Sequence, residues 1–284
     1  MKIISAQKIR EAVSQLCLEA NVYLRKDVLA ALKSAMLKET NSRAKKLLQA
    51  IIENAAVASK DKLAVCQDTG LPVVFLEVGQ GVKINGDLKT AVHKGIEDGY
   101  KKGSFRNSVI EHPLERGQSG YHPGVIHYDI VNNNKLKITV LPKGFGAENK
   151  TQLKMFKPTA KIEEIKKFII EVVRSAGADA CPPYIVGVGI GGTADYACLL
   201  AKKALLKNIV HRPSSLPTGQ AGIVHRLGKQ LLNDINKLNI GPMGLGGRTT
   251  CLGVNVEMHP THIAGLPVCV NLSCHALRSA SKIV

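Results

Sequence analysis

The stretch YIVGVGIGGTADYACLLAKKALLK, residues 184–207, joins a predicted strand to a predicted helix and does most to decide the fold. Its first seven residues are rich in β-branched side chains, which favours a short strand. Residues 193–207 place apolar side chains at helical spacing. Gly187 to Gly192 also match the spacing G-x-G-x-x-G of a dinucleotide-binding turn, so this stretch allows two interpretations.

A dinucleotide-binding turn needs an acidic residue about 20 positions after its glycines to hold the ribose hydroxyls. No Asp or Glu occurs between Tyr196 and Asn233. We therefore interpret the glycines as points of close backbone approach, with amides that could face an anion at the start of the following helix. An NAD-dependent oxidoreductase remains the alternative from a different functional class.

Outward from this stretch, helices and strands are mixed without regular βαβ alternation, which favours an α+β fold with short, largely antiparallel strands. Apolar residues recur every three or four positions through the first sixty residues and predict a helical N-terminal segment. Further helices are predicted over residues 87–102, 160–176 and 218–238, and further strands over residues 73–78, 251–257 and 266–272.

Residues 124–131 and 135–142 flank three asparagines and are expected to pair as an antiparallel hairpin. The sequence shows no internal repeat and no low-complexity linker. We therefore expect residues 1–284 to form a single domain.

The 284 residues are 45% hydrophobic and 4% aromatic, without Trp, so the core must be built from Ala, Val, Ile and Leu. Lys, Gln, Arg and Glu interrupt the apolar residues of the N-terminal MKIISAQKIREAV, unlike in a secretory signal. No run approaches the ~20 apolar residues of a membrane span. We expect a cytoplasmic protein without a membrane partner.

The formal net charge of +17 raises the question of nucleic-acid binding. Lys and Arg are spread along helical stretches such as RAKKLLQAII and AKKALLKN, and basic tracts with interleaved aromatic residues are lacking. We therefore expect no nucleic-acid partner. An anionic substrate or an acidic partner subunit accounts for the sign of the charge equally well.

Seven cysteines are scattered through the chain, at positions 17, 66, 181, 198, 251, 269 and 274. Their odd number and the lack of an export signal make a disulfide framework unexpected. The sequence contains no C-x-x-C pair, which excludes a zinc knuckle or a bacterial-ferredoxin motif. The cysteines are either buried thiols or metal ligands that come from distant positions.

Several short motifs could carry chemistry. The turn Cys66-Gln67-Asp68 sets a soft metal ligand beside an amide and a carboxylate. Cys181 precedes two prolines, which stiffen a loop. Taken alone, each cysteine also fits a buried structural thiol.

Four further features could bind a compact ligand or transfer a proton. Glycine-rich stretches over residues 142–150 and 241–250 suggest backbone wrapped around a small ligand, although each also fits an ordinary turn. Arg106 could clamp a carboxylate, and His262 could transfer a proton near neutral pH, although each also fits an exposed surface residue.

Taken together, the motifs resemble the cluster-binding region of the class I fumarase and tartrate dehydratase family, and they occur in the family's order. They are VCQDTGLP, FRNSV, PKGFGAENK, GVGIGGTADYACLLAKKAL, IGPMGLGGRTTCLGV, PTHIAGLPV and NLSCHALR. The resemblance covers nearly the whole chain from residue 60 onward. The second domain of single-chain members is missing, as in the α subunit of the two-subunit form.

The resemblance implies a [4Fe–4S] cluster whose protein ligands are Cys66, Cys181 and Cys274. Three thiolates for four irons leave one iron without a protein ligand, open to a substrate carboxylate and hydroxyl. It also implies an α2β2 assembly with a β subunit, which would supply the base for the carbon-bound proton. The implied reaction is reversible hydration of fumarate to L-malate, with dehydration of L-tartrate to oxaloacetate as the alternative.

The resemblance also implies roles for residues that contact the dicarboxylate. Asp68 and His262 would handle the proton at the departing or incoming oxygen, and Gln67 and Arg106 would fix a carboxylate. The loop from Gly144 to Gly146 would supply a backbone amide. The Phe at its centre replaces a residue that is often small in the family, which leaves open which loop amide contacts substrate.

Overall fold

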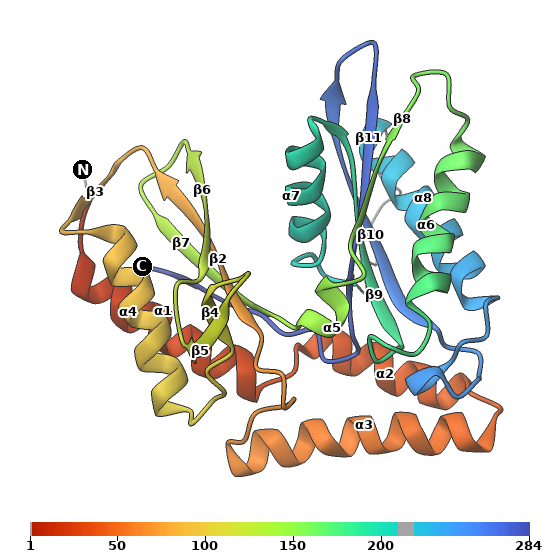
Figure 1. Ribbon diagram of the computed structural model, residues 1–284, viewed down its shortest axis with the longest axis horizontal. Helices are drawn as coiled ribbons and strands as arrows, with labels where there is room; N and C mark the ends of the chain where they lie inside the picture. Colours follow the sequence, from red (N-terminus) through yellow and green to blue (C-terminus); the bar gives the residue numbers. More distant parts are fainter. Residues whose placement is uncertain (1, 210–218) are drawn as a thin grey trace. The chain divides into compact units, whose positions relative to one another are not determined.

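The computed structural model describes residues 2–209 and 219–284. Its mixture of helices and strands confirms the α+β fold. The chain divides into two compact units, both built from segments distant in sequence (Figure 1). The first unit comprises Met1–Arg25, Asn54–Phe145 and Arg278–Val284, and the second comprises Lys26–Glu53 and Gly146–Leu277. The single domain stays a prediction.

The first unit is built on a four-stranded sheet with the order β12-β7-β2-β6. Its helices and strands are β1 (Lys2–Ser5), α1 (Ala6–Val22), β2 (Leu71–Gly79), β3 (Val82–Asn85), α4 (Leu88–Lys102), β4 (Val109–His112), β5 (Arg116–Gly120), β6 (Val125–Val131), β7 (Leu136–Lys143) and β12 (Ala280–Ile283). One hydrophobic core joins α1 and α4 to β2 and β7. The predicted N-terminal helix and the helix over residues 87–102 are both confirmed.

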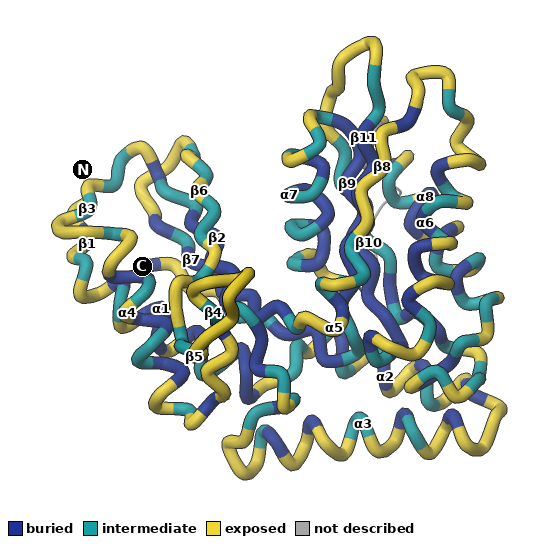
Figure 2. The backbone as a smooth tube through the Cα atoms, in the orientation of Figure 1, coloured by how far each residue is buried: buried dark blue, intermediate teal, exposed yellow. Residues whose placement is uncertain are grey.

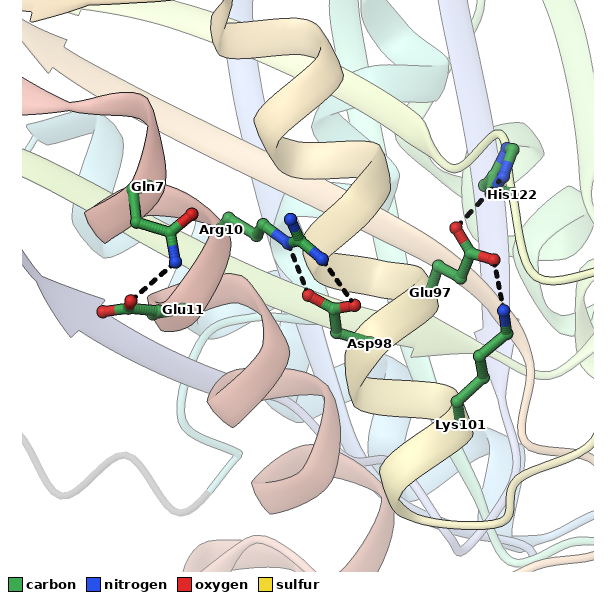
Figure 3. A network of polar contacts seen from close by, with 7 residues as sticks. All are labelled: Gln7, Arg10, Glu11, Glu97, Asp98, Lys101 and His122. Atoms are coloured by element: carbon green, nitrogen blue, oxygen red, sulfur yellow. Dashed lines mark hydrogen bonds and ion pairs between the residues drawn. The ribbon is translucent and has the colours of Figure 1, made fainter.

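Two glycines allow α4 to pack closely on α1. A Cβ at Gly95 or Gly99 would lie 2.6 Å from a backbone oxygen of α1. Beside this contact, the Arg10 guanidinium donates to both oxygens of Asp98, at 2.5 and 2.9 Å (Figure 3). The same hydrogen bond lowers the pKa of the Asp98 carboxyl. Small residues and one ion pair thus fix the helix pair against the sheet.

The predicted hairpin between β6 and β7 is wrong, because β2 lies between these two strands. β2 pairs in parallel with β6 and antiparallel with β7. The connection over residues 132–135 crosses the end of β2, a span of roughly two strand spacings or ~10 Å. Gly79 makes room for it, since a Cβ there would lie 2.5 Å from the Asn133 backbone oxygen. The asparagines do form a turn, but they bridge over a third strand.

The second unit contains a four-stranded sheet with the order β10-β9-β11-β8. Its elements are α2 (Lys26–Lys38), β8 (Gln152–Phe156), α6 (Ile162–Ala176), β9 (Tyr184–Gly192), α7 (Ala194–Ala204), α8 (Gly219–Asn236), the 3-10 turn η1 (Pro242–Gly244), β10 (Cys251–Thr261) and β11 (Leu266–Ser273). Two helices run across the unit boundaries in sequence, namely α3 (Ser42–Asp61) and α5 (Phe145–Glu148).

Helices cover both faces of the second sheet (Figure 1). α6 and α8 pack on one face, where Ile169 and Leu231 join Val188 of β9 in the main core. α7 packs on the other face, where Ala197 and Ala201 are fully buried. Figure 2 accordingly shows the central strands of this sheet as buried. The predicted helices over residues 160–176, 193–207 and 218–238 are confirmed, although α7 ends at Ala204.

The glycines of residues 187–192 lie within β9 and its exit, beside α7. A Cβ at Gly187 would lie 2.1 Å from the Ala201 backbone oxygen, and a Cβ at Gly189 would lie 2.1 Å from the Ala197 oxygen. This contact supports the interpretation of close backbone approach. The described helices include none that is long and apolar enough to cross a membrane.

We predict that Gly189→Ala destabilises the protein by about 1–3 kcal/mol, because the added methyl group forces α7 away from β9. Gly265→Ala is the matched control in the same unit, since its added Cβ would meet only a flexible methionine methyl group at 3.8 Å. Urea unfolding monitored by circular dichroism measures both. Equal free energies of unfolding for the two variants would contradict the proposed contact.

Candidate functional site

Cys66 lies in a tight turn of the first unit, between α3 and β2. The Asp68 carboxylate organises this turn, because one oxygen accepts from the Gly70 amide at 2.9 Å and the other accepts from the Phe145 amide at 2.8 Å. Gly70 has a φ of +75° and packs against the backbone of Lys143. The turn therefore holds both oxygens of Asp68 in fixed directions.

Arg278 supports the same turn from the C-terminal segment. Its buried guanidinium donates to the Asp68 backbone oxygen and to Asn21 Oδ1 of α1, the latter at 3.3 Å. Arg278 was not predicted as a site residue from the sequence. Its position four residues after Cys274, in a segment of small and apolar residues, was the available signal.

The first unit brings further predicted residues to the Cys66 turn. The Thr69 hydroxyl donates to the Arg106 backbone oxygen at 3.2 Å. A Cβ at Gly144 would lie 3.2 Å from Asp68 Oδ2. The side chains of Gln67 and Arg106 are exposed, and among the described residues the Arg106 guanidinium has no hydrogen bond or ion pair. Arg106 is therefore available to bind an anionic ligand.

The second unit brings the segments of Cys181 and Cys274 together. Cys181 lies between α6 and β9, and Cys274 directly follows β11. The His275 amide donates to the Cys181 backbone oxygen at 3.3 Å, and His275 Nδ1 lies 3.0 Å from the same oxygen. Because a carbonyl oxygen can only accept, Nδ1 must carry the proton. Cys181 and Cys274, which are 93 positions apart in sequence, thus lie on adjoining segments.

Burial separates the predicted ligands from most other cysteines. Cys66, Cys181 and Cys274 are partly exposed, whereas Cys17, Cys251 and Cys269 are buried. Burial raises the pKa of Cys251 to about 12 and also raises the pKa of Cys17 and Cys269.

Thiolates, not thiols, bind metals, so the buried cysteines are poor ligands. The fourth remaining cysteine, Cys198, is partly exposed and lies in α7, where it packs beside Cys269 of β11. The partly exposed Cys66, Cys181 and Cys274 are chemically suited to an iron–sulfur cluster. The described residues contain no preformed group of three His, Cys, Asp or Glu side chains for a metal ion, so this ligand set stays a prediction.

His262 lies in the exposed loop between β10 and β11, and its Nδ1 accepts from the Ala264 amide at 3.2 Å. Cys274 follows the opposite end of β11. A strand of this length separates the two by roughly 25 Å, at ~3.3 Å per residue. Within the second unit, His262 and the two cysteines are therefore not brought together, and the role of His262 stays a prediction.

The short helix α5, which contains Gly146, is anchored by side chains of the second unit. Glu148 accepts from Lys202 of α7 at 2.5 Å and from Asn271 of β11 at 2.9 Å. Asn271 also donates to Thr151 at 2.8 Å. Its buried Oδ1 has no partner among the described residues, which costs about 1–3 kcal/mol. This network was not predicted from the sequence, where its local signal is the acidic residue in GAENK.

A groove of about 690 Å³ lies elsewhere in the second unit, between β8 and α6. Lys154, Phe156 and Phe168 line it, and it contains none of the predicted site residues. This groove therefore does not bear on the predicted ligand set.

Comparison with known proteins shows similarity along nearly the whole chain. A family model described as fumarate hydratase (Fumerase) matches residues 10–282. The chain is 41% identical to the "Putative L(+)-tartrate dehydratase subunit alpha" of Methanocaldococcus jannaschii, with 97% of each chain covered. It is 28% identical to the L(+)-tartrate dehydratase subunit alpha of Escherichia coli K12, over 99% of this chain and 92% of that one.

We predict that iodoacetamide labels Cys66, Cys181 and Cys274 of the cluster-free folded protein on the order of tenfold or more faster than Cys17 and Cys251, which are buried as thiols. Peptide mass spectrometry after timed labelling measures each rate. Labelling in denaturant is the control, since all five should then react alike. Fast labelling of Cys17 or Cys251 in the folded protein would show that burial does not separate the two groups.

Proposed function

Because the chain belongs to the fumarate hydratase family, we propose that it is the α subunit of an iron–sulfur carbon–oxygen hydro-lyase acting on a four-carbon dicarboxylate. The family match, which spans residues 10–282 and includes all three motif cysteines, carries this proposal. The proposed reaction is the reversible hydration of fumarate to L-malate. Dehydration of L-tartrate to oxaloacetate is the second candidate, and the names of both relatives favour it.

The proposed cofactor is a [4Fe–4S] cluster with Cys66, Cys181 and Cys274 as its protein ligands. When bound, such a cluster supplies a Lewis acid at its fourth iron, which polarises a substrate hydroxyl or carboxylate. Partial exposure of the three thiols and the adjoining segments of Cys181 and Cys274 support this ligand set.

The chain's own residues orient the substrate and handle a proton. Arg106, exposed and without an internal partner among the described residues, can pair bidentately with one substrate carboxylate, and Gln67 can donate to the same group. The segment from Gly144 to Gly146 is proposed to supply a backbone amide to the ligand, because glycine allows the backbone to approach it closely.

Asp68 is the proposed acid–base group at the oxygen that enters or leaves. Its two oxygens each accept one backbone amide and keep a further lone pair for a water or a hydroxyl proton. We propose the same proton role for His262, which lies on a separate loop. The base that takes the carbon-bound proton is assigned to the β subunit.

The assembly follows from the same assignment. Both relatives are named as alpha subunits, which supports a partner β subunit, and we propose an α2β2 complex. The net charge of +17 suits a dianionic substrate and an acidic partner. A cytoplasmic location would keep all seven cysteines reduced.

Turnover by the anaerobically purified complex tests the reaction. We expect the complex to hydrate fumarate, which is measured as a loss of absorbance at 240 nm. For the second candidate we expect it to form oxaloacetate from L-tartrate. Arg106→Lys should reduce kcat/KM by about 10- to 100-fold, because an ammonium cannot replace the guanidinium fork. A complex that turns over neither acid would refute the proposed function.

Iron and sulfide analysis tests the ligand set. We expect Cys66→Ser, Cys181→Ser and Cys274→Ser each to lose most of the bound iron and sulfide, because an alkoxide is a poor ligand for this cluster. Cys251→Ser is the control, since that thiol is buried in the core. Retention of the full cluster in any of the three variants would remove that cysteine from the set.

A further inference from the structure

The segment of residues 146–151, which comprises most of the short helix α5 and the turn after it and is called the loop below, contacts both cysteine-bearing segments of the second unit. A Cβ at Gly146 would lie 3.8 Å from the Asp179 backbone oxygen, and Lys150 donates to the Asp179 carboxylate at 2.8 Å. Asp179 is two residues before Cys181. This loop therefore runs beside the Cys181 segment.

Glu148 joins the same loop to the Cys274 segment. Its carboxylate accepts from Asn271 Nδ2 at 2.9 Å, and Asn271 is three residues before Cys274. Asn271 is 1% exposed and also donates to Thr151 at 2.8 Å, so two residues of the loop hold its amide in one orientation. The Asn271 amide thus donates to two acceptors among the described residues, and Glu148 is the charged one of the two.

Lys202 of α7 also holds the Glu148 carboxylate in place. Its ammonium donates at 2.5 Å from α7, and the two side chains are only 19% and 21% exposed. Limited exposure reduces solvent screening of this pair. The Lys150–Asp179 pair is weaker by the same criterion, because the Asp179 side chain is 72% exposed. Glu148 is thus the principal anchor of the loop.

We propose that Glu148 is a positioning residue, which sets the loop amides around Gly146 relative to the Cys274 segment and so relative to the cluster and its substrate. This inference rests on the proposed function. In this proposal Glu148 acts through Asn271, whose side-chain amide donates to the Glu148 carboxylate. Lys150 has the same role toward the Cys181 segment, with a smaller effect.

Variants of the full-length protein, purified anaerobically from cells that also express the partner subunit, test this role. Glu148→Gln keeps the side-chain length and an acceptor for Asn271 but loses the charge that Lys202 binds. Glu171→Gln is the matched control, because Glu171 pairs with Arg174 at 2.6 Å on the exposed surface of the same unit. Lys202→Gln is the second variant in case Glu148→Gln does not fold.

Two readouts separate positioning from simple stability. The first is the rate of cluster loss to EDTA, followed by visible absorbance, which we expect to rise at least fivefold in Glu148→Gln and about twofold in Lys150→Met. The second is the change in the visible spectrum when L-malate or L-tartrate is added. We expect this change to be lost in Glu148→Gln and retained in Glu171→Gln, at protein concentrations where circular dichroism shows all variants folded.

Each outcome decides one of the two proposals. If the wild-type protein contains no iron and sulfide, the proposed function fails. If it contains the cluster, and Glu148→Gln or Lys202→Gln matches Glu171→Gln in both EDTA rate and spectral response, the positioning role alone is overturned. Faster cluster loss together with an absent spectral response supports it.

Discussion

The contact between α7 and the glycines of β9 fixes the part of the second unit that carries two cysteines. β9 lies inside the sheet, between β10 and β11, so its position sets the register of both neighbours. Cys181 enters β9 at one end, and Cys274 leaves the antiparallel β11 at the same end. The close distance between β9 and α7, which only glycine permits, therefore determines the positions of these two cysteines in the second unit.

Local periodicity was sufficient to predict the long helices and the central strands. Apolar spacing located α1, α4, α6 and α8, because each buries one face against a sheet. It could not locate β12, whose four residues pair with β7 across more than 130 positions in sequence. The hairpin error has the same origin, since the partner of a strand depends on segments far away and not on the turn beside it.

The candidate site was predictable in its motifs but not in its supports. The first unit brings together residues from motifs that the family resemblance assigns to one site, namely Cys66, Asp68, Arg106 and Gly144. Arg278 and Glu148 were missed, because the importance of an ionic residue inside the fold shows only through partners distant in sequence. His262 illustrates the converse, since a motif residue lies at the far end of β11 from Cys274.

The discontinuous first unit also constrains how the protein is made. The Cys66 turn is synthesised well before Arg278 and β12, so its support from Arg278 and the pairing of β12 with β7 form only after these later residues have been added. The Lys2 ammonium, moreover, donates to the Val284 backbone oxygen at 2.9 Å. A nascent chain stalled before residue 278 would therefore present the Cys66 turn without the Arg278 guanidinium that supports it.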